Sequence, residues 1–232
     1  MAADGTVHVV YYERTERGDL LRHRSAPAGA AWAPAVPFGF DDHRNWGPDL
    51  IALADGSLVV VFDHILTDLT SRGYFTTWRD GRWSEPVPLT PDGGGEVGSG
   101  HVAEGAPGEL VYVWIGRPVE GQNPFRAWSA WRRDGGWESP QPLSDGAVDA
   151  WHTNVERRPD GSVLVGFDVG PGGGETTLLV AEGRAGAFAA LEDLSATSRP
   201  GERPHFAFEA NGTDHVTWFH KEDSRPMHVY VR

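Results

Sequence analysis

The sequence of 232 residues contains no cysteine, which excludes disulfide bonds, thiolate metal sites and a cysteine nucleophile. It has no apolar run near the roughly 18 residues that a membrane-spanning helix needs. No basic-then-apolar leader stands at its N-terminus. We therefore expect a soluble chain with no membrane partner, and the sequence leaves open whether it is cytoplasmic or secreted.

Basic residues are scarce, because 20 Lys and Arg stand against 33 Asp and Glu, a net charge of −13. Such a chain repels phosphate backbones and anionic membranes, so nucleic acid is not an expected partner. A glycine-rich phosphate loop and a Gly-x-Ser-x-Gly nucleophile elbow are also missing from the sequence. The expected partner is instead a small molecule or a glycan.

Glycine, proline and tryptophan are abundant, with 30, 17 and 10 residues, and supply the turns and large aromatic fillers of an all-β chain. In the stretch 48–64, two apolar runs flank the pair Asp55 and Gly56. This pattern predicts two antiparallel strands joined by a tight turn. Because both runs are apolar at nearly every residue, both faces of the hairpin should be covered.

The hairpin recurs along the whole chain. Its turn glycines, Gly5, Gly56, Gly108, Gly161 and Gly212, are spaced 51, 52, 53 and 51 residues apart. A second marker, an aromatic residue that begins the last strand of each repeat, keeps nearly the same spacing; it is Trp32, Trp83, Trp137 and Phe188. A period near fifty built only from strand signals predicts the blades of a β-propeller.

The predicted fold is all-β, a five-bladed β-propeller that forms a single domain over residues 1–232. The expected blades cover approximately residues 1–40, 41–92, 93–145, 146–198 and 199–232. The first repeat lacks its innermost strand and the last lacks its outermost, so both end blades are incomplete. Either the ring closes with two thinned blades, or it belongs to a longer ring, or a partner supplies strands and the protein forms oligomers.

The repeat predicts which side chains share one rim of the propeller, where the inner strand of a blade starts and the second strand ends. Seven residues before the turn glycines stand Asp49, His101, Asn154 and His205, and eight after them stand Glu13, His64, Gly116, Val169 and His220. Imidazole titrates near neutral pH and suits acid and base catalysis. The catalytic candidates are Asp49, His101, His205, His64 and His220.

Other rim residues are candidates for binding. Trp46 and Trp151 are expected in rim loops that break the repeat, where they can stack on a ligand, and Arg44 and Arg203 can clamp a carboxylate. The remaining substrate-binding candidates are Asn154 and Glu13. One divalent metal ion in the central channel is a further candidate, with His101, His152 and His205 as ligands, although histidines in propellers also serve as plain hydrogen-bonding groups.

The repeated segments Asp55–Phe62, Asp80–Trp83 and Pro86–Leu89 resemble the bacterial sialidase-like propellers with Asp-box (BNR) repeats. The resemblance implies relatives among glycoside hydrolases, polysaccharide lyases that use His and Tyr, and lectins, some with a metal in the channel. The sequence thus favours an enzyme of hydrolase or lyase type that acts on a carbohydrate or small polar substrate. The alternative is a non-catalytic, lectin-like propeller that binds glycans.

Overall fold

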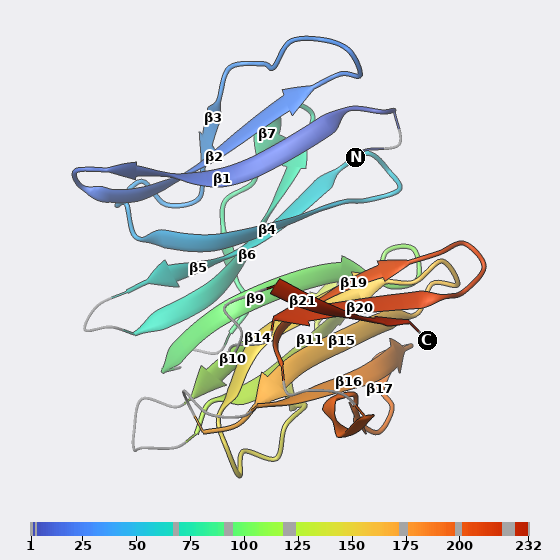
Figure 1. Cartoon of the computed structure of the whole chain (residues 1–232). Helices are drawn as coiled ribbons and strands as arrows, with labels where there is room; N and C mark the ends of the chain where they lie inside the picture. Colours follow the sequence, from blue (N-terminus) through green and yellow to red (C-terminus); the bar gives the residue numbers. More distant parts are fainter. Residues whose placement is uncertain are drawn as a thin grey trace. The chain divides into compact units, whose positions relative to one another are not determined.

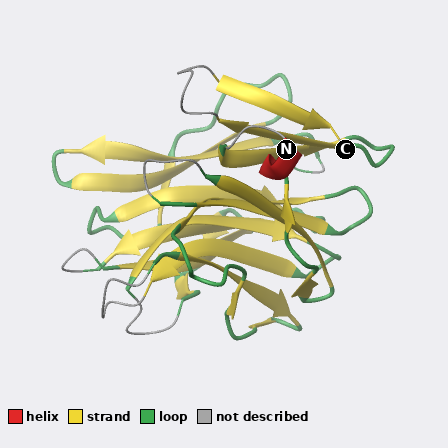
Figure 2. Cartoon of the chain, turned by 60° about the horizontal axis from the view of Figure 1, so that its bottom comes forward, coloured by secondary structure: helices red, strands yellow, loops and turns green. Residues whose placement is uncertain are grey.

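The computed structural model describes residues 2, 4–66, 70–90, 95–117, 124–171, 176–197, 201–219 and 226–231. Strands dominate these ranges, and their one helical element is the 3-10 turn η1 (Ser195–Thr197) (Figure 2). The prediction of an all-β chain is confirmed. In the same ranges, no helix has the length and apolar character needed to cross a membrane. The backbone forms two compact units, Met1–Gly100 and His101–Arg232 (Figure 1).

The first unit holds two antiparallel sheets. The sheet of order β1-β2-β3 comprises β1 (Val7–Thr15), β2 (Gly18–Ala26) and β3 (Val36–Phe38). The second sheet comprises β4 (Asn45–Ala52), β5 (Leu58–Ile65), β6 (Ser71–Arg79), β7 (Arg82–Trp83) and β8 (Val87–Pro88). The hairpin expected in 48–64 forms as β4 and β5, and β5 is buried over seven of its eight residues because both of its faces are covered.

The second unit holds three more antiparallel sheets, and strand β9 crosses the boundary between the units. The first comprises β9 (Glu96–Glu104), β10 (Leu110–Arg117), β11 (Arg126–Arg133), β12 (Gly136–Trp137) and β13 (Gln141–Pro142). The next comprises β14 (Ala150–Arg157), β15 (Val163–Val169), β16 (Thr177–Arg184), β17 (Ala187–Phe188) and β18 (Glu192–Asp193). The last comprises β19 (Glu202–Phe208), β20 (Asp214–Phe219) and β21 (Pro226–Val231).

The repeating turn has one geometry throughout. All five marker glycines have a left-handed φ between 81° and 92°, a conformation that glycine adopts without steric cost. At Gly56, the carboxylate of Asp55 also accepts hydrogen bonds from the backbone N–H and the hydroxyl of Ser57, at 3.0 and 2.5 Å. These local interactions explain why the turn, more than any other segment, could be recognised in the sequence.

In the three five-stranded sheets, the predicted last strand is split into two pieces of two residues each. In the second sheet, β7 and β8 both pair with β6, and Pro86 stands between them. Proline donates no backbone hydrogen bond, so it interrupts the ladder at an edge strand. The marker Trp83 packs 4.6 Å from Phe38, ring centre to ring centre, so this aromatic ring joins the two sheets of the first unit as expected.

Candidate functional site

The inner strands share a β-bulge near their start. The pairing register shifts between Trp46 and Asp49 in β4, between Trp151 and Asn154 in β14, and between Glu202 and His205 in β19. Inside each shift, the residue nine before the turn glycine has a left-handed φ, with 55° at Gly47, 43° at His152 and 58° at Arg203. Bulges of this kind redirect side chains and are common next to active sites, and non-glycine residues rarely adopt such φ values elsewhere.

In the second unit the bulge places His152 against Asp168. Nδ1 of His152 lies 3.1 Å from Oδ1 of Asp168, whose side chain is completely buried, while the imidazole is about one third exposed. The backbone N–H of Arg203 also donates to Asp168 Oδ1, at 3.2 Å. A buried carboxyl group at this distance orients the ring and favours a proton on Nδ1, which leaves the lone pair of Nε2 directed away from it.

The same strands bring together two of the predicted site residues. Nδ2 of Asn154 lies 3.3 Å from Nδ1 of His205, and it donates to the backbone carbonyl of Pro204 at 3.0 Å. Asn154 is buried and His205 is exposed. Because β14 and β19 are neighbours in the second unit, Asn154, His205, His152 and the backbone of Arg203 belong to one region of this unit.

An aromatic side chain borders this region. Trp151 pairs with Asp168 across β14 and β15, so the two side chains lie on one face of the sheet. The ring of Trp151 lies 5.4 Å from that of Phe125, and the guanidinium of Arg117 lies 4.4 Å above the Phe125 ring. The region thus combines polar hydrogen-bonding groups with a partly exposed aromatic surface.

The first unit carries a related arrangement at the equivalent positions. Trp46 pairs with Asp63 across β4 and β5, as Trp151 pairs with Asp168, and the ring of Tyr12 stacks on Trp46 at 5.0 Å and 27°. Both aromatic rings are more than two fifths exposed. Trp46 and Trp151 therefore stand inside strands at matching positions of the repeat, which corrects the prediction that they lie in irregular rim loops.

Asp63 differs from its counterpart in its hydrogen bonding. Its side chain is 3% exposed, and Oδ1 has no hydrogen-bond partner among the described residues. Burial alone raises the pKa of Asp63 to about 8, so the group is mostly protonated at neutral pH. A neutral carboxylic acid can both donate and accept a hydrogen bond.

This raised pKa makes the stability of the protein depend on pH. The unfolded chain releases the proton of an aspartate near pH 3.9, whereas the folded form holds it up to about pH 8, so the free energy of unfolding should fall between these values. We expect Asp63→Asn to remove this component. The difference in thermal midpoint between variant and wild type should then grow in favour of the variant from pH 4 to 8 and level off above. A difference independent of pH would contradict the prediction.

The remaining predicted site residues of the first unit are engaged in local interactions. Glu13 pairs with Arg22 at 2.7 Å, His64 lies 3.4 Å from Asp42, and Arg44 donates to the carbonyl of Leu66. Burial lowers the pKa of His64. Asp49 lies half-buried in β4, and His101 lies half-buried in β9 of the second unit.

His220 lies outside the described residues. Within the described ranges, no three or more His, Cys, Asp or Glu side chains converge as metal ligands would. Of the histidines proposed as ligands, His152 contacts Asp168 and His205 contacts Asn154.

The sequence interpretation missed Asp168 and gave Asp63 no function. Both stand seven residues after a turn glycine, where the other three repeats have Tyr12, Ile115 and Phe219. The sequence does show an acidic residue at the end of an otherwise apolar strand in both repeats. Acidic residues are rarely buried unless they are paired, so these two positions could have been recognised as candidates. Comparing repeats position by position would have found them.

The sequence matches no family model and no curated protein. Solved structures do match. One is a protein of unknown function from Dyadobacter fermentans, with a TM-score of 0.72 and 17% identity, covering 99% of this chain and 76% of that one. A second is an α-L-arabinanase of Penicillium chrysogenum complexed with arabinobiose, with a TM-score of 0.71 and 13% identity, covering 100% and 75%.

A third is an α-L-arabinofuranosidase of Fusarium graminearum in complex with an iminosugar inhibitor, with a TM-score of 0.68 and 13% identity, covering 98% and 78%. A microbial sialidase and an ulvan lyase are also similar. At these identities the likeness establishes the fold alone, and the chain has a propeller-like fold. The arabinanase, the arabinofuranosidase, the sialidase and the ulvan lyase are enzymes that act on glycans.

Proposed function

We propose that this protein is an enzyme of hydrolase or lyase type that acts on a carbohydrate, with His152 as its acid–base group and Asp168 as the residue that positions it. The observation that carries the proposal is the 3.1 Å contact between Nδ1 of a partly exposed imidazole and a fully buried carboxyl group. This pair resembles the base and orienting residue of many hydrolytic enzymes.

Both hydrolysis and elimination require a base that removes a proton close to the bond that is broken. In a hydrolase the proton comes from water, and in a lyase it comes from the carbon next to a uronate carboxyl group. His152 contacts Asp168 through Nδ1, so Nε2 is the nitrogen that we assign to the substrate. The left-handed φ of His152, 43°, holds the ring in this orientation at a cost in backbone strain, which favours a functional role.

The surrounding residues suit a sugar substrate. We assign Asn154 and His205 to hydrogen bonds with hydroxyl groups, Trp151 to stacking, and the exposed side chain of Arg203 to a polar or acidic substituent. Asp49, His101, His64 and His220 remain candidate catalytic groups, and Trp46, Arg44 and Glu13 candidate binding groups. We further propose that the five sheets are the five blades of a single propeller domain over residues 1–232.

The proposal is tested by His152→Ala on a panel of neutral and uronate-containing polysaccharides. Reducing ends report hydrolysis, and ultraviolet absorbance of an unsaturated product reports elimination. We expect the variant to lose about 10²- to 10⁴-fold in rate, the usual contribution of an acid–base group. The matched control is His215→Ala, because His215 pairs with Glu209 at 2.7 Å in an exposed setting of the same unit and should be dispensable. Unchanged turnover in His152→Ala would refute the assignment.

A further inference from the structure

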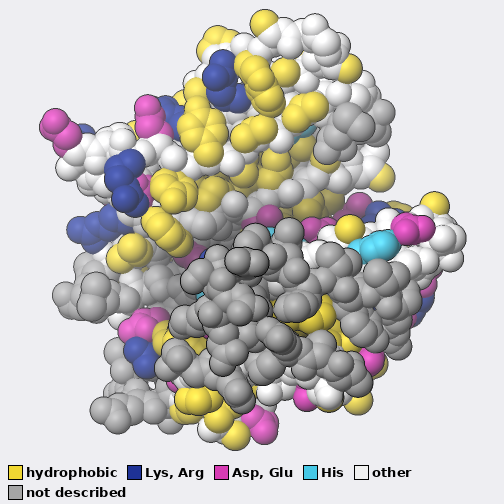
Figure 3. Space-filling model, in the orientation of Figure 1, with side chains coloured by type: hydrophobic (Ala, Val, Ile, Leu, Met, Phe, Trp, Pro, Cys, Tyr) yellow, Lys and Arg dark blue, Asp and Glu magenta, His cyan; other side chains and the backbone are white. Residues whose placement is uncertain are grey.

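The first unit has its own unused polar group. Oδ1 of Asp63 is buried with no hydrogen-bond partner among the described residues. Trp46 pairs with Asp63 across β4 and β5, and its exposed ring stacks on that of Tyr12. In Figure 3, apolar side chains gather over the strands of this unit on the face shown. A buried polar group left unmatched is costly, so its retention beside an exposed aromatic pair calls for a ligand.

The equivalent residues of the second unit show what is missing around Asp63. There His152 and the backbone N–H of Arg203 contact Asp168. In the first unit the place of His152 is taken by Gly47, with a similar φ of 55°. A Cβ added at Gly47 would meet only Oδ2 of Asp63, at 3.7 Å, and one added at Gly98 would meet only the same oxygen, at 4.0 Å. Because both residues are glycines, the carboxyl group of Asp63 lacks the side-chain neighbour that His152 provides for Asp168.

We propose that Trp46, Tyr12, Asp63 and the space at Gly47 form a binding site for an uncharged sugar ring. The apolar face of the ring stacks on the aromatic pair, and a hydroxyl group exchanges hydrogen bonds with the carboxyl group. Burial is the sole cause of the raised pKa of Asp63, so the site offers a neutral carboxyl group. The guanidinium of Arg14, 6.0 Å from the centre of the Tyr12 ring, is already paired with Asp19, so an uncharged sugar suits the site better than an anionic one. The carbohydrate class rests on the proposed function, but binding at this site does not require turnover.

The test uses the full chain carrying His152→Ala, so that catalysis does not interfere. An array of neutral and anionic oligosaccharides selects the neutral probe with the strongest signal, and hydrogen exchange with mass spectrometry then locates its protection. We expect protection of β4 and β5, residues 45–65. The further substitutions Trp46→Ala and Gly47→His should each raise the probe concentration that is needed for the same protection at least tenfold. His at position 47 is compatible with the backbone because His152 adopts a similar φ.

Gly47→Ala is the matched control, because its Cβ makes only an ordinary contact with Asp63 and leaves the space for the ligand open. It should keep the protection within a few fold. The site is refuted if no neutral oligosaccharide binds, if only the second unit is protected, or if Gly47→His binds like Gly47→Ala. The proposed enzymatic function has its own test, and it is refuted if His152→Ala keeps the turnover of the wild type.

Discussion

Asp168→Asn is expected to lower the turnover number by about 10²- to 10⁴-fold, close to the loss expected for His152→Ala itself. The amide of asparagine can present an N–H to Nδ1 of His152. That contact would favour the tautomer protonated on Nε2, which removes the lone pair that acts as base. The N–H of Arg203 donates to Oδ1, so the carbonyl oxygen of asparagine should keep this place and hold the backbone. The amide nitrogen would then take the place of Oδ2, 3.4 Å from Nδ1 of His152.

Because Asp168 acts through His152, the measurement must separate positioning from folding. We expect kcat to fall with little change in KM, and the pH dependence of kcat that reports the imidazole to shift. Glu209→Gln is the matched control, since Glu209 contacts His215 through an exposed pair in the same unit. Equal rates in Asp168→Asn and wild type, with unchanged pH profiles, would contradict a positioning role.

Most of the fold could be predicted because the same turn recurs in every repeat and is specified by local interactions. The turn at Gly56 is specified by its own φ and by the side chain of Asp55, so five copies of it reveal the strands on either side. The fourth strand that the sequence predicts from Trp83 is split into β7 and β8, with Pro86 between them. The same split separates β17 from β18, where no proline stands, so proline alone does not explain it.

The candidate site was less predictable because it depends on bulges. A bulge shifts the register by one residue, so counting from the turn glycine places His152 and Asn154 correctly along the chain but not on the correct face. The pairing of Asn154 with His205 followed from the repeat. The contact of His152 with Asp168 did not, because the left-handed φ at His152 has no marker in the sequence.

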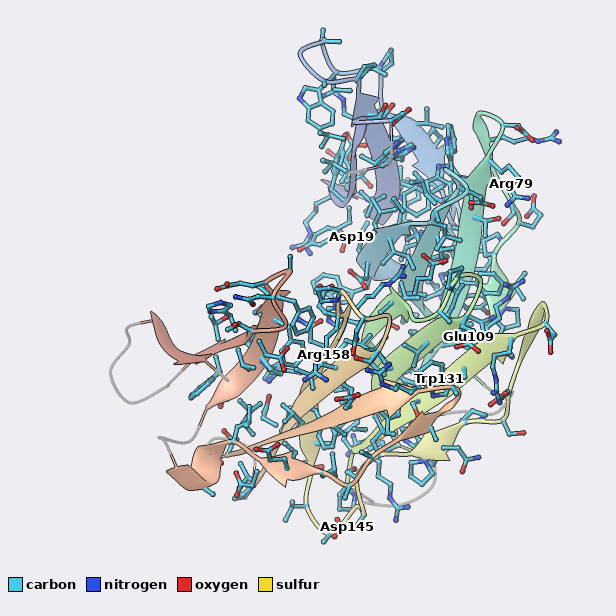
Figure 4. All side chains as sticks on the ribbon, turned by 90° about the vertical axis from the view of Figure 1, so that its right-hand side faces the viewer. Asp19, Arg79, Glu109, Trp131, Asp145 and Arg158 are labelled. Carbon is cyan, nitrogen blue, oxygen red and sulfur yellow. The ribbon has the colours of Figure 1, made fainter. Side chains whose placement is uncertain are left out.

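Arg158→Ala is expected to destabilise the second unit by about 3 to 5 kcal/mol, as the loss of one partner from a buried ion pair usually does. Arg158 (labelled in Figure 4) makes a two-pronged contact with Asp214 and also contacts Glu182 at 2.5 Å. The side chains of Arg158 and Asp214 are only 12% and 9% exposed, so the substitution leaves a buried carboxylate without its counter-charge. Urea unfolding followed by circular dichroism measures the loss, and hydrogen exchange of β14 and β20 locates it.

The same pair allows a sharper test, because charge and packing can be separated. Replacing both residues, with Arg158→Met and Asp214→Leu, removes the buried charges together and should cost less than Arg158→Ala alone. Arg184→Ala is the matched control: Arg184 contacts Asp160 and Glu182 but is 54% exposed, so its pairs are screened by water and their loss should cost much less than the loss of the buried pair. If Arg158→Ala costs no more than Arg184→Ala, the buried pair does not hold β20 to the preceding sheet, and apolar packing around Val216 and Trp218 must do so instead.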